Sequence, residues 1–578
     1  MVVWNLQDLM REKDIDQHVA KLTQLTSSFA EFEKKLFNKN NCVEVPSDTL
    51  RRIFALSEEI SKVSSRLAGF AELSYTEKTN DAKRLARLRD LSKKLVSLEH
   101  QRLFFSEWIR RIPESYAKKI AKQIEPYTYV FEKSVEHRKH LRSPAEEKIM
   151  SLKDTTGVDV LERVYNIVTN KYVFGKKQLA QEELLTLVRS SKEHDRKQAY
   201  EDLLLRYKED NDVLFEIYAG VVMNWHNEEL TVRGYDAPIA PRNEGNDVEH
   251  EIVENLLSVI ENNAALFQEY FSFKANLLGM KNTRYNLYAP YRLNEPSYTF
   301  PEAKKTVLEV FKNFSPVFAS HAKSVFDKQH VHSPPMKGKK SGAFCYSVTN
   351  DTTPYVLVNF AGKLNDVFTL GHELGHAVHG ILGQKNTQFT FHSSLPLAET
   401  ASIFSELLLT DHLLKTASKR VRTFLLVQEL DKIYASVMRQ AFFVMFEKEA
   451  HELIAKGATA DEINARYAAN LRRQFGKQMI IPDHFSYEWS YIPHIFESPF
   501  YCYAYAFGNL LVLSLYHDFT QDKKAFVPRY QKILEAGGSA TPATILARAG
   551  YDISTKSFWQ NGFDEARKIF DELKTLTK

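Results

Sequence analysis

The sequence places three histidines and one glutamate in the short stretch FTLGHELGHAVHG, from Phe368 to Gly380. Within it, His372, Glu373 and His376 form the pattern HExxH. Residues four positions apart lie one turn apart on the same face of an α-helix, so two imidazoles at this spacing can bind one metal ion. The glutamate between them is not needed as a ligand and is placed to accept a proton from a nearby water. The motif therefore predicts a metal-dependent hydrolase with Glu373 as its general base.

A catalytic zinc site has three protein ligands and keeps one position open for water, so a further ligand must come from outside this stretch. The segment LPLAETASIFSELLLTDHLL, which follows a loop rich in Asn, Thr and Ser, contains two candidates. We predict that Glu399 is the third ligand and that Glu406, two turns further on, accepts a hydrogen bond from a ligand histidine. His379 is left out of the ligand set because a fourth protein ligand would close the site.

These segments resemble the oligoendopeptidase F and thimet oligopeptidase family of zinc metallopeptidases, whose motif is HExGHxxH followed by a later Glu-x-x-Ser. HELGHAVH and AETAS match both parts. Four further segments are similar to the oligoendopeptidase F branch: RGYDAP, RYNLYAP, SGAFCYS and IPHIFESPFYCYAYAFG. The resemblance implies one Zn²⁺ per chain, and an endopeptidase that hydrolyses internal bonds of short oligopeptides by attack of a zinc-bound water.

The last of these segments contains polar side chains that could serve the reaction. In the family, a histidine and one or more tyrosines of this region face the zinc and bind the oxyanion and the substrate backbone. The resemblance assigns these roles to His494 and Tyr505, with Tyr501 or Tyr503 as the competing tyrosine. Tyrosines in an apolar segment are also often core residues with a satisfied hydroxyl, so a purely structural role stays open for each of them.

The sequence around the HExxH stretch predicts a mainly α-helical fold. Apolar residues recur every three or four positions over most of the chain, namely over 14–123, 158–229, 249–279 and from 365 almost to the end. The exception is YVLVNF, residues 355–360, which is rich in β-branched residues and predicts a strand before the HExxH helix, itself expected near 368–382. With the resemblance, this implies two helical lobes around a deep substrate cavity and a small β-sheet next to the HExxH helix, as in gluzincins.

Two breaks interrupt the helical pattern. The stretch HLRSPAEEKIMSLKDTTGVD contains Ser-Pro and Thr-Thr-Gly turn signals. We place a boundary there, between an N-terminal helical lobe, 1–157, and a catalytic metallopeptidase domain, 158–578. The segment GYDAPIAPRNEGND, residues 234–247, is predicted to be a loop because it holds two prolines and two glycines.

The predicted strand suggests how a peptide substrate is held. An extended peptide can add to an exposed strand edge through main-chain hydrogen bonds, which demands little of its sequence. The residues expected to bind substrate are those of the strand and of the preceding SGAFCYS loop: Gly342, Ala343, Phe344, Val356 and Val358. At Gly342 the missing side chain would let a bound peptide approach the backbone.

Composition limits the other classes of function. A net charge of +4 over 578 residues, with Lys and Arg spread along the chain, argues against nucleic acid as a partner. Three widely separated cysteines form no CxxC pair and favour a reducing compartment, and the longest apolar stretch is too short to span a bilayer. We expect a cytoplasmic protein that acts on oligopeptides away from the membrane, as a monomer or a homodimer.

Two alternative functions would use the same residues. A carboxypeptidase or dipeptidyl carboxypeptidase would need a cation to bind the free carboxylate of its substrate, and Arg233 and Arg284 are candidates. A catalytically inactive peptide-binding scaffold would be expected to have lost Glu373 or one of the metal ligands. None of these residues is missing from the sequence.

Overall fold

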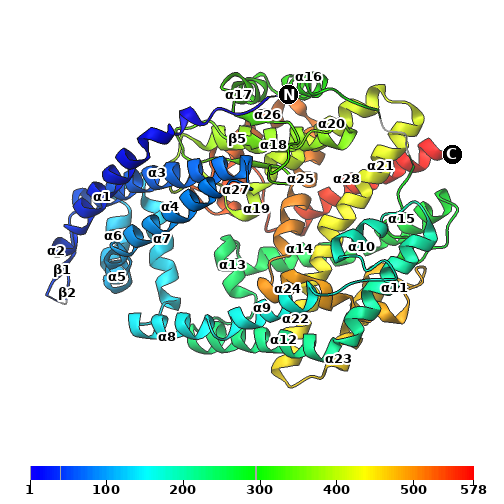
Figure 1. The fold of residues 1–578 in the computed structure, drawn as a ribbon, viewed down its shortest axis with the longest axis horizontal. Coiled ribbons are helices and arrows are strands. Elements are labelled where there is room, and N and C mark those ends of the chain that lie inside the picture. Colours follow the sequence, from blue (N-terminus) through cyan, green and yellow to red (C-terminus); the bar gives the residue numbers. More distant parts are fainter. Residues whose placement is uncertain (1, 40, 293–295) are drawn as a thin grey trace. The chain divides into compact units, whose positions relative to one another are not determined.

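The computed structural model describes residues 2–39, 41–292 and 296–578 and consists mainly of α-helices (Figure 1). The chain forms two compact units, each made of three separate segments. Unit 1 comprises Met1–Leu141, Glu295–His412 and Asp522–Gly550, and unit 2 comprises Arg142–Asn294, Leu413–Gln521 and Tyr551–Lys578. The mainly α-helical class predicted from the sequence is confirmed. No helix in the described part of the chain is both long enough and apolar enough to cross a membrane.

Unit 1 contains the N-terminal helices, the HExxH helix and two helices from late in the chain. Its helices are α1 (Ile15–Ala30), α2 (Glu33–Leu36), α3 (Ser47–Glu77), α4 (Ala82–His100), α5 (Leu103–Arg111), α6 (Glu114–Ala121), α7 (Thr128–His137), α16 (Phe300–Phe314), α17 (Pro316–Asp327), α18 (Leu364–Gly383), α19 (Leu395–Ala398), α20 (Thr400–Thr416, ending beyond the unit), α26 (Lys523–Glu535) and α27 (Pro542–Arg548). Its strands are β1 (Phe37–Asn38), β2 (Asn41–Cys42), β3 (Val331–His332), β4 (Phe344–Tyr346) and β5 (Tyr355–Leu357).

The N-terminal helices and the strands before α18 share one hydrophobic core. Val348, Tyr355 and Leu357 belong to the same buried cluster as apolar residues of α1 and α3 to α6. At Gly69 of α3 an added Cβ would lie 2.6 Å from the Val348 side chain, so α3 packs tightly against the segment after β4. This common core explains why the units differ from the predicted lobes 1–157 and 158–578. The N-terminal helices bury their apolar faces against the strands of the metallopeptidase motif rather than against one another alone.

The small sheet beside α18 has the strand order β3-β5-β4. β5 is the middle strand. It pairs in parallel with β3, where Val331 faces Val356, and antiparallel with β4, where Phe344 faces Leu357. Pairing continues past β5, because the Val358 amide donates to the His332 carbonyl at 3.0 Å. The predicted strand and its place next to the HExxH helix are confirmed, and β4 has β5 as its only strand partner among the described residues.

The described part of unit 2 consists of helices and their connections and contains no β-strand, only two isolated β-bridges. Its α-helices are α8 (Pro144–Asp154), α9 (Val158–Thr169), α10 (Gln181–Leu187), α11 (Glu193–Glu209), α12 (Asn211–Trp225), α13 (Ala240–Asn246), α14 (His250–Asn262), α15 (Ala264–Leu277), α21 (Lys419–Ile433), α22 (Arg439–Ala455), α23 (Ala460–Phe475), α24 (Pro493–Glu497), α25 (Tyr503–Gln521) and α28 (Lys556–Thr577). The prediction of a loop over residues 234–247 is wrong in its second half. There α13 begins with Pro241 in its first turn, a position where the missing N–H of proline costs nothing.

Candidate active site

Helix α18 is fixed at its start and along its length. Its first turn is capped by Asp366, whose carboxylate accepts hydrogen bonds from the amides of Ala361 at 2.8 Å and Lys363 at 3.0 Å. The helix packs against α16, α17, α26 and the strands β4 and β5, and Leu370, Leu374 and most of its other apolar residues are buried. A site built on such a helix is held more rigidly than one built on a loop.

The three predicted metal ligands lie together in unit 1. His372 and His376 of α18 have ring centroids 4.8 Å apart, with the ring planes nearly perpendicular. Glu399, between α19 and α20, places Oε2 at 3.4 Å from Nε2 of each histidine. Their donor atoms all lie within 4.8 Å of one another, and no other group of three or more His, Cys, Asp or Glu side chains in the described ranges has this arrangement.

The spacing of the donor atoms fits a zinc ion. In a tetrahedral site with bonds of about 2.0–2.1 Å, neighbouring ligand atoms lie about 3.4 Å apart, which is the distance from the Glu399 oxygen to each imidazole nitrogen. Burial alone would raise the pKa of Glu399, but the hydrogen bond and charge of His376, together with the charge of His372, lower this pKa to about 2. The carboxylate is thus ionised at neutral pH, as a metal ligand must be.

Close packing brings Glu399 to the histidines. At Gly375 of α18 an added Cβ would lie 2.6 Å from the Ala401 carbonyl oxygen, so only glycine lets the backbone of α20 approach this closely. The Ser402 hydroxyl then donates to Glu399 Oε2 at 2.6 Å and fixes the carboxylate. Nearby, the Tyr530 hydroxyl donates to the Thr400 carbonyl at 2.9 Å and anchors the start of α20.

Two further side chains, Glu406 and His379, form hydrogen bonds that help to fix the positions of the predicted ligands. Nδ1 of His372 lies 2.6 Å from Glu406 Oε1, which leaves Nε2 of the same ring to face Glu399. His379 is buried, and it forms a hydrogen bond with the backbone of Ala398, the residue before Glu399. Burial is the main reason why the pKa of His379 falls to about 3. Both residues lie beside the group of three predicted ligands and are not part of it.

Glu373 faces the same cleft as the ligand group. The cleft has a volume of about 420 Å³ and lies between β4, α18 and the loop after α18. Its walls are formed by Ala343, Phe344, Cys345, Tyr346, Ser347, His372, Glu373, His376, His379, Gly380, Phe391, His392, Ser393, Ala398 and Glu399. Burial raises the pKa of Glu373, while the charges of His372 and His376 oppose this change. A carboxylate held beside a metal-ligand group in a peptide-sized cleft can exchange protons with a water there.

The match of this chain to a protein-family model decides its family. The model described as Peptidase family M3 matches residues 186–565, which include α18 and Glu399. The chain belongs to peptidase family M3. It is therefore an enzyme, a metallopeptidase that acts on oligopeptides.

The peptidase is similar to curated and solved proteins over nearly its whole length. Oligoendopeptidase F (chromosomal) of Lactococcus lactis subsp. cremoris is 26% identical over 557 residues, which cover 92% of this chain and 91% of that protein. A solved structure from Chlamydophila abortus, provisionally described as a peptidase, matches with a TM-score of 0.90 at 23% identity and covers 99% of this chain and 98% of that one. Oligoendopeptidase-F from Enterococcus faecium matches with a TM-score of 0.70 at 20% identity, covering 97% and 99%. These two structures have the same fold as the peptidase.

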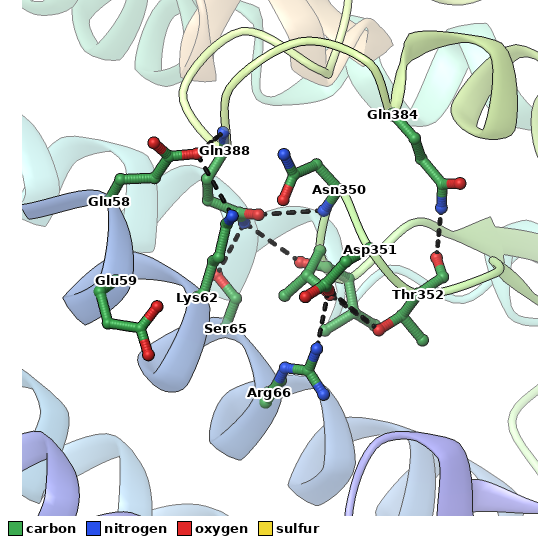
Figure 2. A network of polar contacts seen from close by, with 12 residues as sticks. Glu58, Glu59, Lys62, Ser65, Arg66, Asn350, Asp351, Thr352, Gln384 and Gln388 are labelled. Carbon is green, nitrogen blue, oxygen red and sulfur yellow. Dashed lines mark hydrogen bonds and ion pairs between the residues drawn. The ribbon is translucent and has the colours of Figure 1, made fainter. Parts of the chain in front are cut away.

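A polar network fixes the loop that follows α18 (Figure 2). The Gln388 amide donates to Glu58 of α3 at 2.9 Å, and its side-chain oxygen accepts from the Asn350 amide at 3.0 Å. Arg66 of α3 forms an ion pair of 2.7 Å with Asp351, next to Asn350 in the β4–β5 connection. The N-terminal helix α3 thus fixes both the β4–β5 connection and the loop that carries His392 into the cleft.

The predicted substrate-binding residues divide into two groups. Ala343 and Phe344 line the cleft beside the metal-ligand group, and Gly342, with a φ of 77°, precedes them. Val356 and Val358 are buried, at 0% and 1% exposure, in and just after the middle strand, so neither lies at a free strand edge. The pattern of apolar residues identified a strand but could not reveal that β4, and not β5, is at the edge facing the cleft.

The four predicted residues of the C-terminal segment lie in unit 2, and three of them form an aromatic cluster. The ring centroids of Tyr501 and Tyr505 are each within 6.2 Å of that of His494 and 5.3 Å from each other. Tyr505 is 37% exposed. Tyr503 is fully buried, and its hydroxyl accepts a hydrogen bond of 2.9 Å from Asn246, as expected of a core residue, so this arrangement gives no support to a role as oxyanion donor.

The sequence argument did not assign roles to two residues that line the cleft, His392 and Cys345, or to Ser402, which forms a hydrogen bond with Glu399. His392 lines the cleft and forms a hydrogen bond with the backbone of Ser347, at the end of β4. Ser402 holds Glu399, and Cys345 of β4 faces the cleft close to Glu373. Only Ser402 had a signal in the sequence, because the Glu-x-x-Ser spacing puts its hydroxyl within one helical turn of the carboxylate.

Proposed function

We propose that the peptidase is a zinc-dependent endopeptidase that hydrolyses internal peptide bonds of short oligopeptides. The observation that carries this proposal is the 3.4 Å spacing of Glu399 Oε2 from both His372 and His376 Nε2, with the Glu373 carboxylate in the same cleft. A zinc ion bound by these three residues would lower the pKa of a water toward about 7 and polarise the peptide carbonyl. The names of similar proteins, such as oligoendopeptidase F of Lactococcus lactis, support the same reaction.

Glu373 performs the proton transfers. Its carboxylate takes one proton from the attacking water as the oxygen bonds to the peptide carbon, and it then delivers that proton to the leaving nitrogen as the carbon–nitrogen bond breaks. Burial raises the pKa of Glu373, and the charges of His372 and His376 oppose this change. Ser402 and Glu406 keep Glu399 and His372 in position throughout, because each contributes a hydrogen bond of 2.6 Å.

The substrate binds as an extended strand along β4. Phe344 to Tyr346 face the cleft, and no second strand pairs with β4 among the described residues, so its backbone groups can bond to a peptide of almost any sequence. His392 lies at the end of this strand and can contact the peptide near the cut bond. Broad specificity follows from recognition through the main chain.

His494 and Tyr505 are the proposed donors to the oxyanion and the substrate backbone, with Tyr501 as the remaining competitor. The clustering of their three rings and the exposure of Tyr505 support this role. A well-placed donor of this kind contributes about 3 kcal/mol to transition-state stabilisation. We also propose a cytoplasmic location, which rests on the cysteine pattern alone.

The exopeptidase alternative has less support. Its two candidate cations already have carboxylate partners within unit 2. Arg284 forms a buried ion pair of 2.6 Å with Glu488, and Arg233 pairs with Glu147 at 2.9 Å and with Glu228 at 2.7 Å. Because these guanidinium charges are already balanced by carboxylates, both arginines are weaker candidates for binding the free carboxylate of a substrate.

The first experiment combines one substitution with blocked peptides. Glu373→Gln keeps the size of the side chain but removes its basicity, so hydrolysis should fall about 10³-fold while the zinc content is unchanged. The control is Glu309→Gln on the exposed face of α16, which should leave activity unchanged. Hydrolysis of a peptide blocked at both ends is expected. If only unblocked peptides are cut, the enzyme is an exopeptidase, and if Glu373→Gln is fully active the general-base role is wrong.

A further inference from the structure

A buried turn in unit 2 holds its backbone in an unusual conformation directly before the tyrosines. Phe500 has a φ of 58°, in the left-handed region that residues with a bulky side chain rarely adopt, and its side chain is fully buried. Tyr501 follows at once, and α25, which carries Tyr505 in its first turn, begins two residues later. Strained conformations of this kind persist only where the surrounding structure imposes them, and they concentrate at functional sites.

Helix α22 imposes the conformation of Phe500. Glu447, at 0% exposure, accepts a hydrogen bond of 2.8 Å from the Phe500 amide through Oε1. One turn further along the helix, the ring of His451 packs against the Phe500 ring with centroids 4.6 Å apart. Oε2 of Glu447 has no hydrogen-bond partner within the described part of the chain. Glu447 thus has one hydrogen bond among the described residues, to a backbone amide of the turn, and this indicates that its carboxyl group serves to fix the turn.

Helix α13 holds the same turn through Arg242. Its Nε donates to the Pro499 carbonyl at 3.1 Å, and its guanidinium lies 5.9 Å from the centre of the Tyr501 ring. Two residues of the turn are therefore fixed through their backbones, Pro499 by α13 and Phe500 by α22. The side chain of Tyr501 is restrained in addition.

We propose that Glu447 and Arg242 are positioning residues that hold the turn Ser498–Cys502 and thereby orient Tyr501 and Tyr505 for the reaction. This inference rests on the proposed role of these tyrosines, since neither Glu447 nor Arg242 is assigned any contact with the substrate. A displacement of about 1 Å in a group that acts on the transition state can lower the rate of reaction by roughly 100-fold. Loss of either hydrogen bond should therefore affect turnover more than substrate affinity.

The protonation state of Glu447 suggests the informative substitutions. Burial raises its pKa to about 8, against the opposing effects of the Phe500 amide and the Arg242 charge. At neutral pH the group is then mostly the neutral acid, and glutamine copies its shape and keeps the accepting oxygen. Glu447→Gln should therefore preserve the turn, whereas Glu447→Leu removes the acceptor while still filling the space.

The kinetic experiment uses these two variants and a double-mutant cycle. Glu447→Leu should lower kcat roughly 100-fold with KM and zinc content nearly unchanged, and Glu447→Gln should retain kcat within about threefold. The matched control is Glu565→Leu, a buried glutamate of the same unit that pairs with Lys568 and does not touch the turn.

The double-mutant cycle tests whether Glu447 acts through the tyrosines. If it does, Tyr505→Phe and Tyr501→Phe should lower kcat by a much smaller factor in the Glu447→Leu background than in the wild type. The inference would be overturned if the factors by which the single substitutions lower kcat simply multiply in the double variants. An unchanged kcat in Glu447→Leu would also overturn it.

A structural measurement separates this inference from the proposed function. After incorporation of 3-fluorotyrosine, the ¹⁹F resonances of Tyr501 and Tyr505 are assigned with the Tyr→Phe variants. Both should shift in Glu447→Leu and remain in place in Glu565→Leu, and unchanged resonances would refute the positioning role even if activity falls. If they shift but neither Tyr→Phe variant lowers kcat, the positioning role stands and the proposed role of the tyrosines fails. Should Glu447→Leu not fold, Arg242→Gln tests the same turn and should show the same coupling to Tyr501→Phe.

Discussion

Two tyrosines two positions apart, Tyr503 and Tyr505, have different surroundings and should respond differently to loss of the hydroxyl. Tyr505→Phe should lower kcat by about 10²–10³ with little change in KM, as expected when one oxyanion donor is removed. Tyr503→Phe should leave kcat nearly unchanged but lower the free energy of unfolding by about 1–3 kcal/mol, because Asn246 loses its buried acceptor. Steady-state kinetics and denaturant unfolding of both variants test this pair. Full activity of Tyr505→Phe would transfer the donor role to Tyr501.

The two glutamates near the histidines should differ in their effect on metal affinity. Glu399→Ala removes a proposed ligand, whereas Glu406→Ala removes the partner of His372 Nδ1 and should weaken zinc binding by about 10–100-fold. The loss in Glu399→Ala should be larger. Competition with a chromogenic chelator gives both dissociation constants. The opposite order would exchange the roles of the two residues.

How far the site could be predicted depends on whether its parts are local in sequence. His372, Glu373 and His376 are recognisable because one helical turn brings them together, whereas the need for a third ligand left both Glu399 and Glu406 as candidates. Tyr503 could not be distinguished from its neighbours, because its burial depends on Asn246, which lies 257 positions away in the chain. The spacing of residues within one helix can therefore indicate a metal site, whereas the burial of a side chain depends on residues that are distant in the sequence.

At the scale of elements, the approach of α20 to α18 depends on Gly375. Gly375→Ala would put a Cβ 2.6 Å from a backbone oxygen that cannot move aside, and overpacking of this kind costs about 1–3 kcal/mol. The unfolding temperature and the affinity for zinc should both fall. Gly245→Ala in α13 is the matched control, since nothing lies within 4 Å of its added Cβ, and alanine there should be neutral or stabilising. Equal behaviour of the two variants would mean that the close contact does not position Glu399.

The helices themselves were largely predictable, and the errors have physical reasons. The period of apolar residues identified the long helices, because one apolar face repeats every three or four residues whatever the face packs against. Helix α13 was missed because the prolines and glycines of residues 234–247 are ordinary loop signals, yet Pro241 occupies the first turn of the helix, where it is tolerated. The edge of the sheet was misplaced because strand order depends on pairings such as Val331 with Val356, which no local pattern contains.

At the scale of the whole molecule, zinc should stabilise the fold. A ligand that binds only the folded state at about 100 times its Kd adds about 2.7 kcal/mol to the free energy of unfolding. The unfolding temperature measured by calorimetry should therefore rise when zinc is added to chelator-treated protein. His376→Ala, which removes one proposed ligand, should abolish most of the increase. An equal rise in that variant would place the stabilising metal elsewhere in the chain.

Unit 1 consists of three separate chain segments, so it is complete only after the last of them has been synthesised. Its last segment supports the loop after α18, because Lys385 pairs with Glu535 at 2.6 Å and the Gly538 amide donates to the Thr390 carbonyl at 2.8 Å. Translation runs from the N-terminus, so the ribosome makes His372 and His376, the proposed metal ligands, more than a hundred codons before these supports. We therefore expect a nascent polypeptide to gain hydrolytic activity only near the end of translation, and a fragment that ends before these supports to be inactive.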